Sequence, residues 1–335
     1  MMLRTPLIAM FALFSLPCSN AEMIRGIVTT TLENDVFTGS DDRFSNGLAV
    51  TWTSGRVADY QSDSFVQDWA GFWSFLPGMD ANSSDQYVSW SLSHEMHTPE
   101  DISLTVPDPA DQPYAGLINL DSSLYSVNER WAHAWNLRLG MVGPISQADH
   151  VQIGFHDLIG AERPEGWDSQ IQNELVLNVM YGASYRLYER RYDSGLGVRL
   201  SPVINAELGT YTTTIGAGMM AEVGLNMPDN LAVRGVGTSF QAVNAIAAEI
   251  ADKWSITGYG ALGAHGVAHF LPLDGPVFRD GLGVGSEDFV TTVELGVTAR
   301  RGRFIGSFGL ALGGSPADQF EDNLDFGVFT LSWIY

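Results

Sequence analysis

The sequence contains many segments in which large apolar residues alternate with small or polar ones, and this two-residue period is what most constrains the fold. In the last segment, FGVFTLSWIY, four large side chains share one face of the expected strand: Phe329, Leu331, Trp333 and Tyr335. In NGLAVTW, Leu48, Val50 and Trp52 alternate with Gly47 and smaller groups. Apolar groups toward lipid and small or polar groups toward a lumen are typical of a membrane barrel, and a final aromatic residue suits the outer-membrane kind.

Twelve such segments predict one all-β domain over residues 22–335, a closed antiparallel transmembrane β-barrel with 12 strands or, alternatively, 14. The expected strands are 27–37, 46–52, 87–96, 132–143, 151–156, 174–187, 195–209, 214–227, 255–270, 288–302, 303–314 and 326–335. Polar stretches at about 57–85, 98–113 and 230–252 are expected to be loops, although 238–251 could form a short helix or an inward-facing strand.

The N-terminus is typical of a secretory signal. Arg4 precedes an apolar run from Pro6 to Pro17, and a small-x-small pattern then predicts cleavage after Ala21. The run is too short to span a bilayer, and no later stretch reaches the roughly 18 apolar residues of a membrane helix. Cys18 would leave with the signal peptide, so the mature chain would contain no cysteine and no disulfide.

The charge balance is strongly acidic. Removal of residues 1–21 takes away one of the 17 Lys plus Arg residues and none of the 39 Asp plus Glu residues, which leaves a net charge of -23. Such a chain is a poor partner for nucleic acid, because nucleic acid attracts basic surfaces. Its only lysine is Lys253, and an acidic surface can hold divalent cations.

The segment VQIGFHDLIGAE, residues 151–162, combines alternation with reactive side chains. If it is a strand, Val151, Ile153 and Phe155 face lipid, whereas Gln152 and His156 face the lumen. A lone lumen histidine would mean little, but a histidine oriented by an amide or carboxyl group is a suitable general base. Glu162 follows after a short glycine-containing segment.

A second polar cluster lies in TLENDVFTGSDDRFSNG, near the start of the mature chain. Asn34 and Asp35 pair an amide with a carboxylate, and Ser45 falls on the small-residue face of the next strand. Taken alone, Asn34 and Asp35 suit a turn. Their sequence position does not show whether they meet His156.

These segments together resemble a known family. ENDVF, then RFSNG, then GPISQADHVQIGFHDLIGAERPEGWDSQIQNE look like the outer-membrane lipid A deacylases, and the specific part is Q-x-x-x-H-x-x-I-G-A-E from Gln152 to Glu162. Trp167, Gln170 and Asn173 follow in the same pattern. The resemblance implies a monomeric 12-stranded barrel in the cell outer membrane. It also implies an active site in the barrel wall near the extracellular mouth, and calcium-dependent hydrolysis of the 3′-linked acyloxyacyl ester of lipid A in lipopolysaccharide.

By this resemblance, His156 would activate a water molecule and Gln152 would set the geometry. Asp35 and Glu162 would serve the Ca²⁺ site, since hard oxygen ligands suit that ion. Asn34 and Ser45 would hold the water or the oxyanion. Ser45 has no histidine near it in sequence, so a covalent serine intermediate is not expected.

One segment departs from what such a substrate needs. HTPEDISLTVPDPADQPYAG, residues 97–116, contains no lysine or arginine, although basic groups would be expected where phosphorylated sugars bind. Arg43 or Arg163 could substitute. The alternatives to a deacylase are a catalytically silent pore or structural barrel and an outer-membrane phospholipase, whose serine-based pattern is not visible here.

Overall fold

The computed structural model describes residues 24–39, 43–62, 64–229, 231, 250–317, 320, 323 and 325–335, without the side chains of Arg43 and Ser45. The predicted signal peptide 1–21 therefore lies outside the described residues, as does nearly all of the 238–251 segment. Within the described residues, no helix is both long and apolar enough to cross a membrane.

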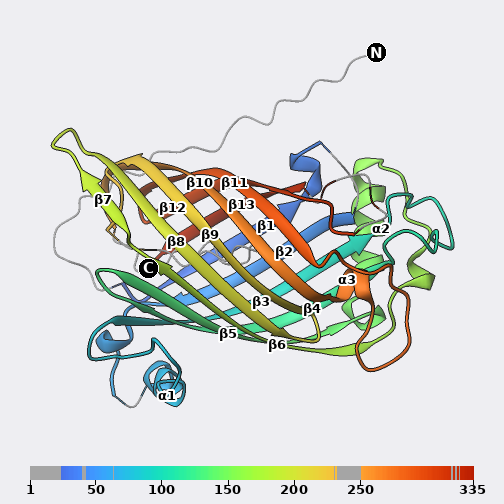
Figure 1. Ribbon diagram of the computed structural model, residues 1–335, viewed down its shortest axis with the longest axis horizontal. Helices are drawn as coiled ribbons and strands as arrows, with labels where there is room; N and C mark the ends of the chain where they lie inside the picture. The colour runs from blue at the N-terminus through green and yellow to red at the C-terminus, as the bar shows by residue number, and fades with distance from the viewer. Residues whose placement is uncertain are drawn as a thin grey trace.

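The described strands form one closed antiparallel barrel (Figure 1). Strands that are neighbours in sequence pair with each other, except that β6 pairs with β8 and not with β7, and β1 pairs with β13, so that the sheet is closed. The short β7 pairs only with the first part of β8, so it extends the position of β6 and the wall has 12 strands, as predicted.

The strands are β1 Gly26–Asn34, β2 Arg43–Ser54, β3 Asp85–Thr98, β4 Ala115–Val127, β5 Trp131–Val142, β6 Glu174–Tyr185, β7 Tyr188–Arg191, β8 Leu196–Gly209, β9 Thr212–Leu225, β10 Ala251–Phe270, β11 Phe289–Gly302, β12 Phe304–Gly313 and β13 Asp325–Ile334. The helices are η1 Asp35–Phe37, η2 Val57–Asp59, α1 Phe65–Phe72, η3 Pro144–Ser146, α2 Ala148–Ile159, η4 Trp167–Ser169 and α3 Leu271–Asp274.

The predicted alternation is confirmed where it was clearest. Leu48 and Val50 of β2 are exposed on the outer face, and so are Phe329, Leu331 and Trp333 of β13. The intervening residues are buried. The polar side chains of the lumen pair with one another: Arg138 binds Asp121 and Glu95, and Tyr211 donates a hydrogen bond to Glu95.

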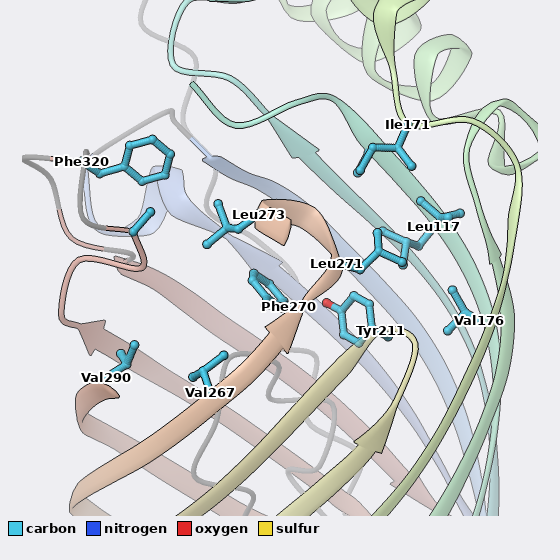
Figure 2. Packing of buried hydrophobic residues seen from close by; sticks show 13 residues of the cluster. Leu117, Ile171, Val176, Tyr211, Val267, Phe270, Leu271, Leu273, Val290 and Phe320 are labelled. Atoms are coloured by element: carbon cyan, nitrogen blue, oxygen red, sulfur yellow. The ribbon is translucent and has the colours of Figure 1, made fainter. Parts of the chain in front are cut away.

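The two ends of the barrel differ. At one end β1 begins and β13 ends, and there the backbone N–H of Arg25 bonds to the carbonyl oxygen of Tyr335; α1 lies outside the wall near this end (Figure 1). We call the opposite end, which carries η1, α2 and α3, the mouth. At the mouth, α3 turns into the barrel and Leu271 and Leu273 pack against Tyr211, Leu117 and other buried apolar residues (Figure 2).

The prediction for residues 151–156 is wrong. They belong to α2 rather than to a strand, so neither Gln152 nor His156 faces the lumen, and Ile153 packs in a buried cluster instead of facing lipid. The predicted count of 12 strands is nevertheless correct, because the sequence analysis counted 151–156 as a strand and did not count β4. In β4 both faces mix apolar and polar residues: inward-facing Leu117 contacts the apolar cluster at the mouth, whereas outward-facing Ser122 accepts a hydrogen bond from Trp69 of the α1 segment.

Candidate active site

Helix α2 lies against the outer face of the wall at the mouth. Its main contacts are with β3 and β4. Gly116 of β4 shares a strand face with the exposed Ile118 and Leu120, and a Cβ atom built on Gly116 would lie 2.3 Å from the Cβ atom of Ala148. A glycine is needed here because it lets the helix approach the strand this closely. The site is therefore built on the outside of the barrel and not in the lumen.

One stripe of α2 faces the wall. Ala148, Gln152 and His156 are spaced by four residues, lie on one side of the helix, and are its buried residues. Val151 and Phe155 are exposed on another side. The stripe therefore directs one amide and one imidazole from the helix toward the barrel.

The turn that ends α2 fixes the ring of His156. Gly160 adopts a left-handed conformation, with φ 72°, and its backbone N–H bonds to the carbonyl oxygen of His156. The chain then turns back so that the carbonyl oxygen of Glu162 lies 2.5 Å from His156 Nδ1. A carbonyl oxygen can only accept, so Nδ1 carries a proton, and in the neutral ring Nε2 therefore carries the lone pair. His156 as a whole residue is 8% exposed.

Gln152, which is 4% exposed, is held by a tryptophan from the segment after the helix. Trp167 Nε1 donates to Gln152 Oε1 at 2.8 Å, and the Trp167 ring packs on Tyr114 with centroids 4.7 Å apart. Burial raises the pKa of Tyr114 to about 12, and its hydroxyl donates to the carbonyl oxygen of Ile102. Through Trp167, α2 is thus joined to the rest of its own connection between β5 and β6 and to the connection between β3 and β4, which carries Ile102 and Tyr114.

The second polar cluster of the sequence, which begins with Asn34, lies on the same outer face. Asn34 ends β1 opposite Gly327 of β13, and Asn46 of β2 lies opposite Met96 of β3. β1 pairs with β2 as far as Glu33 opposite Gly47, and the same register continued by one residue puts Asn34 opposite Asn46. One row across the wall therefore runs from Gly327 through Asn34, Asn46 and Met96 to Gly116 of β4.

Both ends of this row are covered. A Cβ atom on Gly327 would lie 2.4 Å from Phe37 of η1, and Gly116 lies under Ala148 of α2. Asn34 and Asn46 lie between these two contacts. Asn34 accepts a hydrogen bond from Val36 N at 2.9 Å, which begins η1. Asn46 Oδ1 is buried and has no hydrogen-bond partner among the described residues.

The two acidic residues of the predicted Ca²⁺ site, Asp35 and Glu162, differ in burial. Asp35 is 1% exposed at the start of η1, whereas the Glu162 side chain is exposed and its carbonyl oxygen contacts His156. Among the described residues, no group of three or more His, Cys, Asp or Glu side chains could hold a metal ion. The available donors are all oxygens, from carboxylates, the Asn34 amide and backbone carbonyls, and these suit Ca²⁺ in kind.

Within the part of the chain that it describes, the structure shows no contact of the other predicted residues, Ser45, Arg43 and Arg163, with the site. The side chains of Ser45 and Arg43 lie outside the described residues, although both belong to β2. Arg163 is exposed. The sequence reading missed Asn46 as a site residue, although a clear signal existed: it is the amide at an outward position of NGLAVTW, where the other outward residues are large and apolar.

Comparison with known proteins identifies relatives. A family model described as "Outer membrane protein LpxR" matches residues 7–335. No curated protein matches the sequence significantly. The structure is similar to that of LpxR from Salmonella typhimurium, with a TM-score of 0.73 and 14% identity over 92% of this chain and 100% of that chain. The β domain of the Bordetella autotransporter Brka gives a TM-score of 0.43 and 8% identity over 92% and 98%.

Proposed function

Because the chain belongs to the LpxR family of outer membrane proteins, we propose that it is a hydrolase that removes the 3′-linked acyloxyacyl group from lipid A. The protein is an outer-membrane β-barrel. The deacylation, its dependence on Ca²⁺ and the roles of the individual residues are the content of the proposal. Since the barrel closes within one chain, we also propose that the protein acts as a monomer.

The observation that carries the proposal is the contact between His156 Nδ1 and the carbonyl oxygen of Glu162. In the neutral imidazole this contact puts the proton on Nδ1 and the lone pair on Nε2, which is the atom that a general base would use. His156 Nε2 would take a proton from a water molecule, and this water would attack the ester carbonyl carbon. The proton would then pass from His156 to the departing sugar oxygen.

The location of the site suits a lipid substrate. The buried stripe of α2 faces the outer wall at the mouth, so a lipid in the outer leaflet could reach it from the side without entering the lumen. An α-helix rises about 1.5 Å per residue, which puts His156 roughly 12 Å along the axis from Ala148. Neighbouring strands are about 4.8 Å apart, so a helix that crosses the strands over this length would reach from β4 to β2, two strands away, and end one strand short of β1. Asn46 lies on β2 and Asn34 on β1.

The other site residues would stabilise negative charge. When bound, Ca²⁺ would polarise the ester carbonyl, and Asp35 and Glu162 are the carboxylates proposed to hold it. Asn34 and Ser45 would hold the water or donate to the oxyanion. Gln152 would position the water beside His156, because Trp167 occupies its Oε1 atom and leaves its N–H groups to donate.

Two other functions are less well supported. A permanently open pore would need a free mouth, but α3 and its apolar neighbours pack inside the barrel there (Figure 2). A serine-based phospholipase would need a histidine bonded to a serine. Among the described side chains, no serine hydroxyl bonds to a histidine ring nitrogen.

The proposal is tested by mass spectrometry of lipid A from cells that make the protein, compared with cells that make His156→Ala. Wild-type protein should yield lipid A lighter by one acyloxyacyl unit, the variant should not, and glycerophospholipid should stay intact in both. Loss of acyl chains from glycerophospholipid would favour the phospholipase. No change in either lipid, with Ca²⁺ supplied in detergent, would overturn the proposal.

A further inference from the structure

A second helix lies on the outer face of the wall, near the end where β1 begins and β13 ends. The connection between β2 and β3 contains α1, Phe65–Phe72, and Figure 1 shows it outside the barrel. Three of its aromatic side chains are largely exposed: Phe65 (64%), Phe72 (62%) and, just after the helix, Phe75 (73%). Exposed aromatic groups gathered on one short segment mark an interaction surface.

The connection is firmly attached to the wall. Val66 and Ala70 of α1 pack with Val88 of β3 and Leu124 of β4 in a buried cluster. Trp69 Nε1 donates to Ser122 Oγ at 2.9 Å, and Trp135 Nε1 donates to the carbonyl oxygen of Pro77 at 3.0 Å. These bonds join the connection to β4 and β5, so the orientation of α1 relative to the barrel is fixed.

The wall covers only part of the apolar side of α1. At about 100° per residue, Phe72, Phe65 and Trp69 form one stripe, and Val66 and Ala70 form the next stripe around the helix. The second stripe is buried against the wall, whereas the first contacts the wall only through Trp69 and one face of Phe65 and leaves Phe65 and Phe72 largely exposed. Asp68 and Gln67 lie on the remaining side. The uncovered stripe therefore points sideways along the wall.

The uncovered stripe is continuous with the lipid-facing surface of the barrel. The Phe65 ring stacks on Trp90 of β3 with centroids 5.3 Å apart, and Trp90 stacks on Trp52 of β2 at 5.3 Å. The next outward residues toward the mouth are Leu92 and Val50, which are exposed. Aromatic residues form girdles where a barrel wall meets the membrane interface.

We propose that α1 is a membrane-interface helix that inserts Phe65, Phe72 and Phe75 among the phospholipids of the periplasmic leaflet. The first strand begins and the last strand ends at this end, and in an outer-membrane barrel with an even number of strands that end faces the periplasm. Residues 57–84 contain no lysine or arginine, so the attachment depends on aromatic burial and not on attraction to anionic headgroups. The molecules that cover this surface are thus phospholipids, whether zwitterionic or anionic.

Spin labels on single cysteines test this proposal in the full-length protein reconstituted in phosphatidylcholine vesicles. Cys18 is first replaced by serine, which leaves no other cysteine. Labels are placed at Phe72→Cys, at Asp68→Cys on the polar side of the same helix, and at Leu92→Cys as a lipid-facing reference. Collisions with oxygen, which concentrates in lipid, are compared with collisions with a water-soluble nickel chelate. Heat-modifiable migration on gels confirms that each variant is folded.

The Phe72 label should behave like the Leu92 label, with an oxygen-to-nickel ratio severalfold above that of the Asp68 label and a depth of about 5–10 Å below the headgroups. Addition of phosphatidylglycerol should not change this result. A Phe72 label as accessible to nickel as the Asp68 label would overturn the proposal. A label shielded from both reagents would overturn it too, because it would indicate a protein contact such as a second copy of the chain.

Discussion

The Nδ1 atom of His156 lies 2.5 Å from the carbonyl oxygen of Glu162, and Gly160 forms the turn between them. Glu162, the last residue of the motif from Gln152 to Glu162, thus accepts a hydrogen bond from His156 through its backbone carbonyl oxygen. This contact sets the tautomer of His156, and the proposed chemistry depends on how α2 and its closing turn hold the ring.

Replacement of His156 should affect turnover far more than folding. His156→Ala should lower the rate by roughly 10²-fold to 10⁴-fold, the usual contribution of a general base, and His156→Asn should do no better, because an amide cannot take the proton. The rate of acyl release from purified lipid A in detergent is the measurement. Asp157→Ala, on the exposed side of α2, is the matched control. Normal turnover by His156→Asn would exclude the imidazole as base.

Trp167→Phe should lower turnover, because it removes the hydrogen bond that holds Gln152. The phenyl ring can still pack on Tyr114, but Gln152 Oε1 loses its donor. A net loss of about 1 kcal/mol corresponds to roughly a fivefold fall in turnover. The comparison variant is Trp69→Phe, which loses a similar N–H donor to Ser122 in the α1 segment and should keep full activity. Equal effects from both variants would argue against a role for Gln152.

The close approach of α2 to β4 gives a steric prediction. Gly116→Val should push α2 off the wall, because even a Cβ atom would lie 2.3 Å from Ala148 Cβ. A displacement of about 1 Å at the reacting groups can cost roughly 10²-fold in rate, while the barrel stays folded. A Cβ atom added to Gly154 of α2 would meet no atom within 4 Å, so Gly154→Ala should preserve activity and stabilise the helix by about 0.5–1 kcal/mol. Activity assays with heat-modifiable gel migration distinguish the two outcomes.

Calcium dependence should follow the two proposed carboxylates. Asp35→Ala and Glu162→Ala should each abolish the response of activity to added Ca²⁺, whereas Glu165→Ala, in the same exposed segment, should not. Activity is titrated against Ca²⁺ after chelation. Calcium binding by the inactive variant His156→Ala, measured by calorimetry, provides a readout that does not need turnover. Full activity of Asp35→Ala in chelator would contradict the assignment.

Much of the barrel follows from sequence alone. The alternation in β2 and β13 predicts which side chains meet lipid, because a strand that divides lipid from lumen must change polarity at every residue. The same rule failed in β4. There Leu117 faces inward against apolar residues from α3, and Leu124 is covered from outside by the α1 segment, so neither face keeps a single polarity.

The sequence also predicts that Gln152 and His156 share one face, but the prediction assumed a strand, whereas both residues lie in the helix α2. Residues four apart share a face in a strand and in a helix alike, so the pairing is the same in both and the spacing cannot distinguish them. What the tertiary structure decided is where that face points. Gly116 lies under Ala148, and Asn34 and Asn46 lie in the same row of the wall. These contacts join strands and a helix far apart in the chain, and only the closed barrel with its fixed register brings them to one outer surface.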